Sequence, residues 1–219
     1  MKLVWLSHII AENTPLYGGV RDIIRIDRDL SLDSGDSCNT SILNLHSHAG
    51  THVDAPYHFI SNGKTLHEFS PEVWVFNSPV ILDVPVTPSG LLTTDALPFP
   101  QSQQRNVDLV LIRTGFERHR SEDSYWRDGP GLSPKLAEHL RQVYPDIRAI
   151  GVDFISISSF RYRDIGREAH RAFLGRGLLI LEDMALSQIG DCNRLKKVIA
   201  LPLRFASGDG APCTVIGWI

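Results

Sequence analysis

Residues 48–58 read His-Ala-Gly-Thr-His-Val-Asp-Ala-Pro-Tyr-His, which puts several potential metal ligands into one short segment. Zinc and manganese bind imidazole nitrogen and carboxylate oxygen in proteins. Both ligand types occur in the run, at His48, His52, Asp54 and His58. The run therefore predicts a metal or catalytic site rather than a group of unconnected loop histidines. His46 lies two residues before His48, so we expect it on the same side of an incoming strand, as a group behind the ligands or as a ligand itself.

The spacing within this run indicates an extended or looped segment rather than a helix. Gly50 and Pro56 interrupt it, and glycine and proline both disfavour helix. In an extended chain His52 and Asp54 point to the same side. A turn at Gly50 would bring His48 towards them.

The composition of the whole chain favours one soluble domain, residues 1–219, with a small-molecule partner. The chain has 219 residues, of which 42% are hydrophobic, enough for an ordinary core. A net charge of −3 and a pI of about 6.3 favour neither nucleic acid nor an anionic membrane as partner. We find no apolar run long enough to span a membrane and no secretory leader at Met1, so we expect a cytoplasmic protein.

The cysteines do not form a recognisable pattern. Cys38, Cys192 and Cys213 are scattered and odd in number, and no two have C-x-x-C spacing. A disulfide framework is therefore not expected, and a reducing compartment is favoured. We expect these three side chains to serve in packing.

Extended and helical patterns alternate along the chain. Segments rich in β-branched residues predict strands at 3–6, 41–45, 80–84, 107–112, 147–152, 178–181, 198–203 and 214–218. A helix is predicted over 134–143, with Ser133 as N-cap and Pro134 in the first position. A second helix is predicted over 167–174. The proline-rich stretches 84–89 and 97–101 are interpreted as loops. Together these elements predict an α/β domain with a mixed sheet.

The run at 48–58 also matches H-x-G-T-H-x-D-x-P-x-H, and by this signature the chain resembles the metal-dependent cyclase family. That family includes bacterial kynurenine formamidases and isatin hydrolases. The segments 6–8, 14–19 and 208–212 resemble the family's opening and its C-terminal segment. The resemblance implies a swivelling β/β/α fold and assembly as a homodimer or homotetramer.

The resemblance also implies roles for particular residues. It makes His48, His52 and Asp54 metal ligands and His58 the proton donor and acceptor. Two later ligands lie twelve residues apart in the family, and His170 and Glu182 have that spacing here. Glu182 also follows the apolar run 178–181 directly, at the predicted carboxyl end of a buried strand, where active-site groups often lie. The implied cofactor is Zn²⁺, two ions per subunit, with Mn²⁺ as the alternative.

The substrate implied by the resemblance is a small aromatic amide. An arylformamidase would convert N-formyl-L-kynurenine to L-kynurenine and formate in the kynurenine pathway of tryptophan catabolism. The formamidases commonly carry Trp-Pro-Gly where this chain has Tyr17-Gly18-Gly19, so Tyr17 is the candidate substrate contact. The aromatic side chains we expect around a flat substrate are Tyr17, Phe59, Phe69 and Trp74.

Other functions compete with this hypothesis. Within the same chemistry, an isatin hydrolase, another ring-opening hydrolase, or a lyase or cyclase that stabilises an enolate would use the same ligands. A non-catalytic metal-binding protein is disfavoured, because structural zinc sites are rich in cysteine and none lies near the run. A serine hydrolase is disfavoured because the chain has no G-x-S-x-G elbow.

Overall fold

The computed structural model describes residues 2–190 and 195–219, so Cys192 lies outside the described residues. A mixed sheet of nine strands forms the body of this part of the chain. Its parallel half consists of four neighbouring strands, β6 (Pro79–Asp83), β8 (Leu109–Arg113), β10 (Ala149–Val152) and β11 (Leu179–Glu182). Its antiparallel half continues through β4 (His52–Asp54), β13 (Gly210–Trp218), β12 (Lys197–Pro202) and β5 (Val75–Phe76), with β1 (Leu3–Trp5) beside β13.

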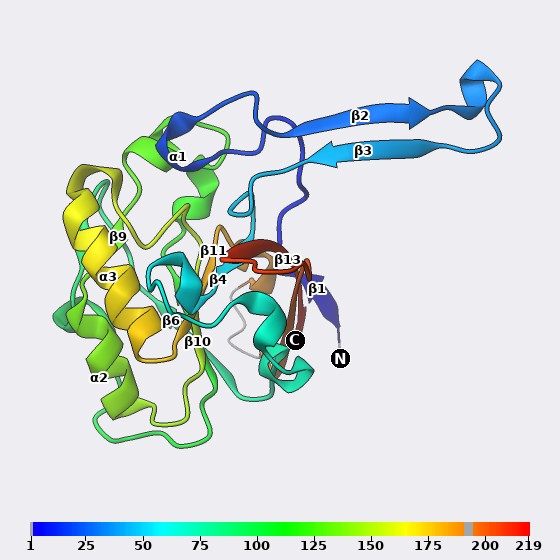
Figure 1. Ribbon diagram of the computed structural model, residues 1–219. Coiled ribbons are helices and arrows are strands. Elements are labelled where there is room, and N and C mark those ends of the chain that lie inside the picture. The colour runs from blue at the N-terminus through cyan, green and yellow to red at the C-terminus, as the bar shows by residue number, and fades with distance from the viewer. Residues whose placement is uncertain (1, 191–194) are drawn as a thin grey trace.

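Helices cover one face of the parallel half (Figure 1). They are α2 (Lys135–Val143) and α3 (Arg163–Gly175), while α1 (Ser124–Arg127) is a single turn. Successive side chains of a strand point to opposite faces. Val110 and Ile112 of β8 accordingly pack in the core beneath the helices, whereas Leu109 and Leu111 pack in a second core on the other face. The parallel strands are therefore buried on both faces, which explains their continuous apolar sequence.

A hairpin arm formed by β2 (Arg25–Leu30) and β3 (Thr40–Asn44) projects from this body (Figure 1). Both of its strands are mostly exposed. A further short parallel pair, β7 (Leu91–Leu92) and β9 (Gly131–Leu132), lies outside the large sheet.

The structure confirms the predicted fold class and most of the predicted elements. A strand lies within or across every segment predicted to be extended, although the one at 41–45 belongs to the arm and not to the main sheet. Helical dihedral angles begin at Pro134, as expected for α2. The second helix begins at Arg163 rather than at 167. Its first turn is mostly polar, so apolar periodicity does not mark this start in the sequence. The stretches 84–89 and 97–101 lie outside helices and strands.

The cysteine prediction is only partly correct. Cys213 is buried on β13, but Cys38 is exposed near the tip of the arm, so it does not serve in packing. Neither is in a disulfide. Among the helices of the described ranges, none is long and apolar enough to cross a membrane.

The sheet topology determines where the functional side chains meet. The short strand β4 lies between β11 and β13, antiparallel to both. Its register places His52 opposite Glu182 and Asp54 opposite Gly210. Helix α3 packs next to β11. The carboxyl end of β11, the strand β4 and the inner face of α3 therefore converge on one place.

Candidate metal centre

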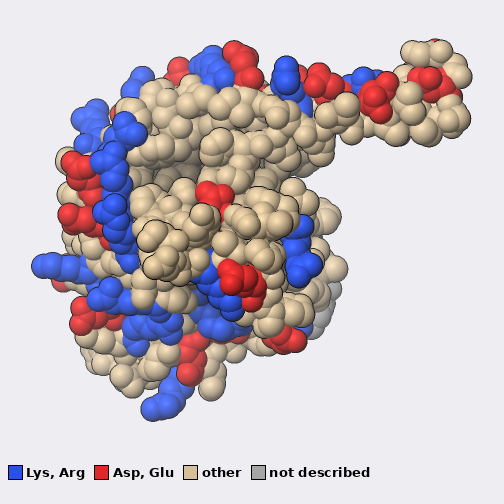
Figure 2. All heavy atoms as spheres, viewed as in Figure 1, with Lys and Arg blue, Asp and Glu red and all other residues tan. Residues whose placement is uncertain are grey.

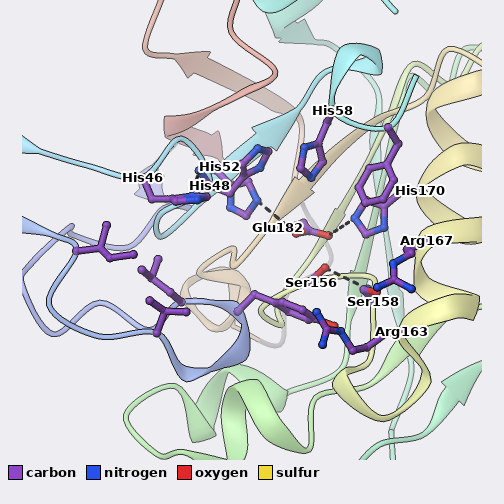
Figure 3. A pocket seen from close by; sticks show the side chains of 15 residues that line it. His46, His48, His52, His58, Ser156, Ser158, Arg163, Arg167, His170 and Glu182 are labelled. Carbon is purple, nitrogen blue, oxygen red and sulfur yellow. Dashed lines mark hydrogen bonds and ion pairs between the residues drawn. The ribbon is translucent and has the colours of Figure 1, made fainter. Parts of the chain in front are cut away.

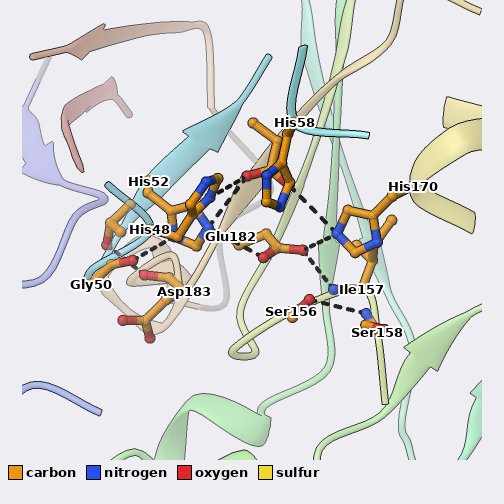
Figure 4. A network of polar contacts seen from close by, with 12 residues as sticks. His48, Gly50, His52, His58, Ser156, Ile157, Ser158, His170, Glu182 and Asp183 are labelled. Atoms are coloured by element: carbon orange, nitrogen blue, oxygen red, sulfur yellow. Dashed lines mark hydrogen bonds and ion pairs between the residues drawn. The ribbon is translucent and has the colours of Figure 1, made fainter. Parts of the chain in front are cut away.

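The structure brings together the five side chains expected to bind metal. Figures 3 and 4 label His48, His52, His170 and Glu182 at this place. The five side chains come from β4, from the segment just before it, from α3 and from β11, and they are His48, His52, Asp54, His170 and Glu182. His52, Asp54, His170 and Glu182 are all at most 4% exposed. These five residues are called the ligand set below.

Local backbone features aim the two buried imidazoles. Gly50 has φ +64°, a left-handed conformation that L side chains rarely adopt, and it makes the turn expected in the run. Nδ1–H of His52 donates a hydrogen bond to the Gly50 carbonyl at 2.8 Å. Nδ1–H of His170 donates likewise to the Gly166 carbonyl, one helical turn earlier, at 2.8 Å. The Nε2 atoms of both rings are left to face the carboxylates, as metal-ligating histidines require.

The distances from His52 and His170 to the two carboxylates are those of ligand atoms around a common ion, whereas Nδ1 of His48 and Oδ1 of Asp54 lie 2.8 Å apart, as in a direct hydrogen bond. Nε2 of His52 lies 3.5 Å from Asp54 Oδ1 and 3.3 Å from Glu182 Oε2. Nε2 of His170 lies 3.5 Å from Asp54 Oδ2 and 3.4 Å from Glu182 Oε1. A tetrahedral zinc ion with bonds of about 2.0–2.1 Å separates its ligand atoms by about 3.3 Å. Direct hydrogen bonds would be shorter, at about 2.9 Å.

Asp54 has the features of a carboxylate shared by two ions. It belongs to two groups of potential ligands, one with His48 and His52 and the other with His170 and Glu182. Its Oδ2 atom is buried without a hydrogen-bond partner, and a buried polar atom left in this way is costly. In contrast, Oε1 of Glu182 accepts the Ile157 backbone N–H at 2.7 Å. The ligand set therefore fits two divalent cations on either side of Asp54.

The electrostatics of the ligand set also favour cations. Burial lowers the pKa of His48, but hydrogen bonds to Asp209 and Asp54 outweigh burial and raise it to about 10. The pKa of His170 is likewise lowered by burial but raised to about 10 overall by Asp54 and Glu182. Burial opposes ionisation of Asp54, yet contact with His170 and His48 holds its pKa well below the usual range. The carboxylates thus hold positive charge in the form of protons, which a metal ion can replace.

His58 lies beside the ligand set and contacts it through a neighbour. Its ring stacks on His48 with 3.9 Å between centroids. Its Nδ1–H donates to Oδ2 of Asp209 at 3.2 Å, and Nε2–H of His48 donates to the same oxygen at 2.9 Å. Burial, the largest effect, lowers the pKa of His58. A neutral ring with its proton on Nδ1 has a free lone pair on Nε2, which suits a proton acceptor.

Asp209 was not singled out as a functional residue on sequence grounds. It lies in the glycine-flanked segment 208–212, whose family resemblance was the available signal. The neighbouring residue must be a glycine for this segment to lie so close to His48, because a Cβ on Gly210 would lie 2.4 Å from Cε1 of His48. His46 accepts the backbone N–H of His48 on its Nδ1 at 3.1 Å, and it lines the cavity beside the ligand set.

A cavity of about 370 Å³ opens onto the ligand set (Figure 3). Tyr17 and Phe59 line it, as expected for substrate contacts. Phe59 also stacks on His170, with 4.4 Å between ring centroids. Phe69 and Trp74 do not line this cavity. They pack against each other in the second core, on the opposite face of the sheet, so the expectation that they surround a substrate is wrong.

Comparison with known sequences relates the chain to one family. A family described as "Putative cyclase" matches residues 4–159. A kynurenine formamidase of Bacillus thuringiensis subsp. konkukian is 30% identical over 186 residues, covering 85% of this chain and 83% of that protein. A kynurenine formamidase of Bacillus anthracis is 28% identical over the same shares of the two chains.

Comparison with solved structures shows the same fold. An isatin hydrolase bound to the product analogue thioisatinate has a TM-score of 0.81 at 18% identity, covering 100% of this chain and 92% of that one. Isatin hydrolase A from Ralstonia solanacearum has a TM-score of 0.79 at 21% identity, over 99% and 91% of the two chains. These likenesses confirm the type of fold expected from the resemblance.

Proposed function

The chain belongs to the Cyclase family, and from that premise we propose that it is a metal-dependent hydrolase of small aromatic amides. The leading reaction is that of an arylformamidase, in which N-formyl-L-kynurenine is cleaved to L-kynurenine and formate. The formamidase relatives support this choice, because they align over 85% of the chain.

One observation carries the proposal, namely the position of Asp54 between two sets of potential ligands. Its Oδ2 atom is buried and unpartnered, and the Nε2 atoms of His52 and His170 lie 3.5 Å from its oxygens. We propose two Zn²⁺ ions per subunit, with Mn²⁺ as the alternative, held by the ligand set. When bound, such ions would supply Lewis-acid polarisation of the amide carbonyl and a water of lowered pKa.

The remaining chemistry falls to side chains of this chain. We assign to Nε2 of His58 the transfer of a proton from the attacking water to the leaving nitrogen, because its Nδ1 is held by Asp209. Tyr17 and Phe59 would hold the aromatic ring of the substrate. Phe59 would also fix the ring of His170 by stacking on it.

The test is hydrolysis by the purified chain after removal and controlled return of Zn²⁺ or Mn²⁺. N-formyl-L-kynurenine, formanilide and isatin are offered separately. Metal-dependent release of formate from N-formyl-L-kynurenine is the expected result. Turnover of isatin alone would replace the formamidase assignment with the isatin hydrolase alternative. Metal binding without turnover of any of the three would favour a non-catalytic metal-binding protein.

We further propose that two copies of the chain pair through the hairpin arm, as a homodimer or as half of a homotetramer. Ile26 and Leu43 are opposite each other in the arm, and they are 39% and 59% exposed. Ile42 on the other face is 57% exposed. An isolated two-stranded hairpin is only marginally stable in water, so this apolar surface needs a partner. Light scattering should give a dimeric or tetrameric mass that Leu43→Asp reduces to that of the monomer.

We also propose that residues 1–219 work as one domain in the cytoplasm. The ligand set and Asp209 come from β4, α3, β11 and the segment before β13, so the site needs most of the chain. The unpaired thiols of Cys38 and Cys213 suit a reducing compartment.

A further inference from the structure

Two arginines line the active-site cavity at the end away from the metal ligands. Arg163 and Arg167 belong to α3, which also carries His170 (Figure 3). Residues spaced by three and four positions share one face of a helix. With a rise of about 1.5 Å per residue, Arg167 lies about 4.5 Å and Arg163 about 10 Å from His170 along the helix axis. The same helix face therefore presents a metal ligand and, beyond it, two positive charges.

These positive charges lack a strong partner among the residues that the structure describes. Among the described residues Arg163 has no ion-pair partner, and its guanidinium lies over the Phe160 ring at 5.4 Å from the centroid. Arg167 is paired with Asp164, but these side chains are 50% and 92% exposed. Exposed pairs of this kind contribute little stability, so a ligand can displace or share them. Both guanidinium groups can therefore bind an anion.

The rest of the cavity wall has no carboxylate that faces Arg163 and Arg167 among the described residues. Of the described residues that line it, Glu182 is the only acid, and it faces His52, His170 and the Ile157 N–H. Figure 2 shows basic side chains gathered along the flank where α3 lies in Figure 1. An anion entering the cavity would thus meet positive charge at the outer end and metal ligands at the inner end.

An unpartnered hydroxyl accompanies the arginines. The Tyr17 oxygen is buried and has no hydrogen-bond partner in the described structure. The Tyr17 ring packs against Phe160 with 5.8 Å between centroids, and Phe160 is the ring beneath Arg163. A buried hydroxyl without a partner is costly, and a hydrogen bond to a ligand would remove that cost. Tyr17 therefore belongs to the same end of the cavity as Arg163.

We propose that Arg163, Arg167 and the Tyr17 hydroxyl bind a carboxylate at the far end of the substrate, which selects aryl amides that carry an acidic tail. This inference rests on the proposed function and narrows its substrate class. Guanidinium groups match a carboxylate in shape and can bind it with two parallel hydrogen bonds. The amide bond of such a substrate would lie at the ligand set while its carboxylate lies one to two helical turns away.

The experiment compares two substrates that differ only at the acid, N-formyl-L-kynurenine and its α-carboxamide. The zinc-loaded wild-type protein should prefer the acid in kcat/KM, and mainly through KM. Arg163→Gln and Arg167→Gln should each reduce that preference on the order of tenfold or more, and the double variant should abolish it. Tyr17→Phe should reduce it by a smaller factor. Turnover of the carboxamide should fall by a smaller factor than turnover of the acid in the arginine variants.

Arg171→Gln is the matched control, because Arg171 continues the same four-residue spacing on α3 but does not line the cavity. It should leave both substrates unaffected. A preference for the acid that survives in the double variant would overturn the proposal, as would an equal loss on both substrates. If wild type hydrolyses neither compound, the proposed function fails. The carboxylate site is then tested by calorimetry, which compares the affinity of the protein for L-kynurenine with its affinity for the carboxamide of L-kynurenine. Equal affinities, or no binding of L-kynurenine, would refute the carboxylate site.

Discussion

Nδ1 of His58 and Oδ2 of Asp209 lie 3.2 Å apart, although 151 residues separate them in the chain. The same carboxylate oxygen lies 2.9 Å from Nε2 of His48. One acid therefore orients both the candidate base and a candidate ligand. A hydrogen bond to the far nitrogen of an imidazole fixes which nitrogen carries the proton.

Asp209→Asn should lower kcat on the order of tenfold to a hundredfold while most of the metal is retained. The amide cannot stabilise a positively charged His58 as a carboxylate does, and it fixes the ring less well. Steady-state kinetics together with metal analysis of the same preparation measure both effects. Unchanged kcat would show that Asp209 has no part in orienting the base.

His58→Ala should retain its metal but lose on the order of 10² to 10⁴ in turnover, the usual contribution of positioned proton transfer. Burial places the pKa of His58 below 6.5, so the active, neutral form predominates at pH 7. In wild type kcat/KM should therefore fall as the pH drops below 6.5, and the variant should lack this limb. His67→Ala, at an exposed histidine outside the cavity, is the control. Loss of metal in proportion to activity would make His58 a ligand instead.

Gly210→Ala should weaken zinc binding tenfold or more, because the added Cβ would lie 2.4 Å from Cε1 of His48 and 2.9 Å from the Val53 carbonyl. Backbone cannot give way cheaply, so the imidazole must move. Gly175→Ala is a suitable control, since its Cβ would meet only Ile60, at an ordinary 3.8 Å. Competition with a chromophoric chelator measures the affinity. Equal zinc affinity in the two variants would disprove the close approach.

Zinc binding should release protons, and its affinity should rise with pH. In the metal-free protein the pKa values of His48 and His170 are both raised to about 10, so both rings are protonated at pH 7.5. The protonated rings of His48 and His170 contribute to the stability of the metal-free fold. This contribution is complete below pH 6.5, the ordinary pKa of histidine, and is lost as the pH rises through about 10. Calorimetry in buffers of different ionisation enthalpy should give at least two protons released per chain, because Glu182 and Asp54 also raise the pKa of His52. No release at pH 7.5 would contradict the assigned protonation.

Much of the site could be predicted from sequence because its signals are local. Alternation along a strand places His52 and Asp54 on one side, and Gly50 provides the turn that brings in His48. Asp209 could not be found in this way. Its position depends on the register of β13 with β4, and a pairing between distant segments leaves no spacing to recognise.

The arginines on α3 were missed for a related reason. Apolar periodicity marks the buried face of a helix, and the first turn of α3 begins with Arg163 and Asp164 and has Ile165 as its single large apolar residue. The arm was missed as a unit because β2 is mostly charged, with only Ile26 and Leu30 apolar, on a hairpin that is exposed on both faces. Its form depends on neighbours that the pattern of its own residues does not reveal.

The most direct test of the two-ion site is the number of zinc ions bound per chain, measured by native mass spectrometry after excess metal has been removed. We predict about two in wild type and in the control Glu168→Ala, which changes an exposed acid on α3. We predict about one in His170→Ala and in Glu182→Ala, each verified as folded by circular dichroism, because the ion between Asp54 and these two residues is lost. A single ion in wild type, or two ions in either of these variants, would contradict a centre in which Asp54 is shared.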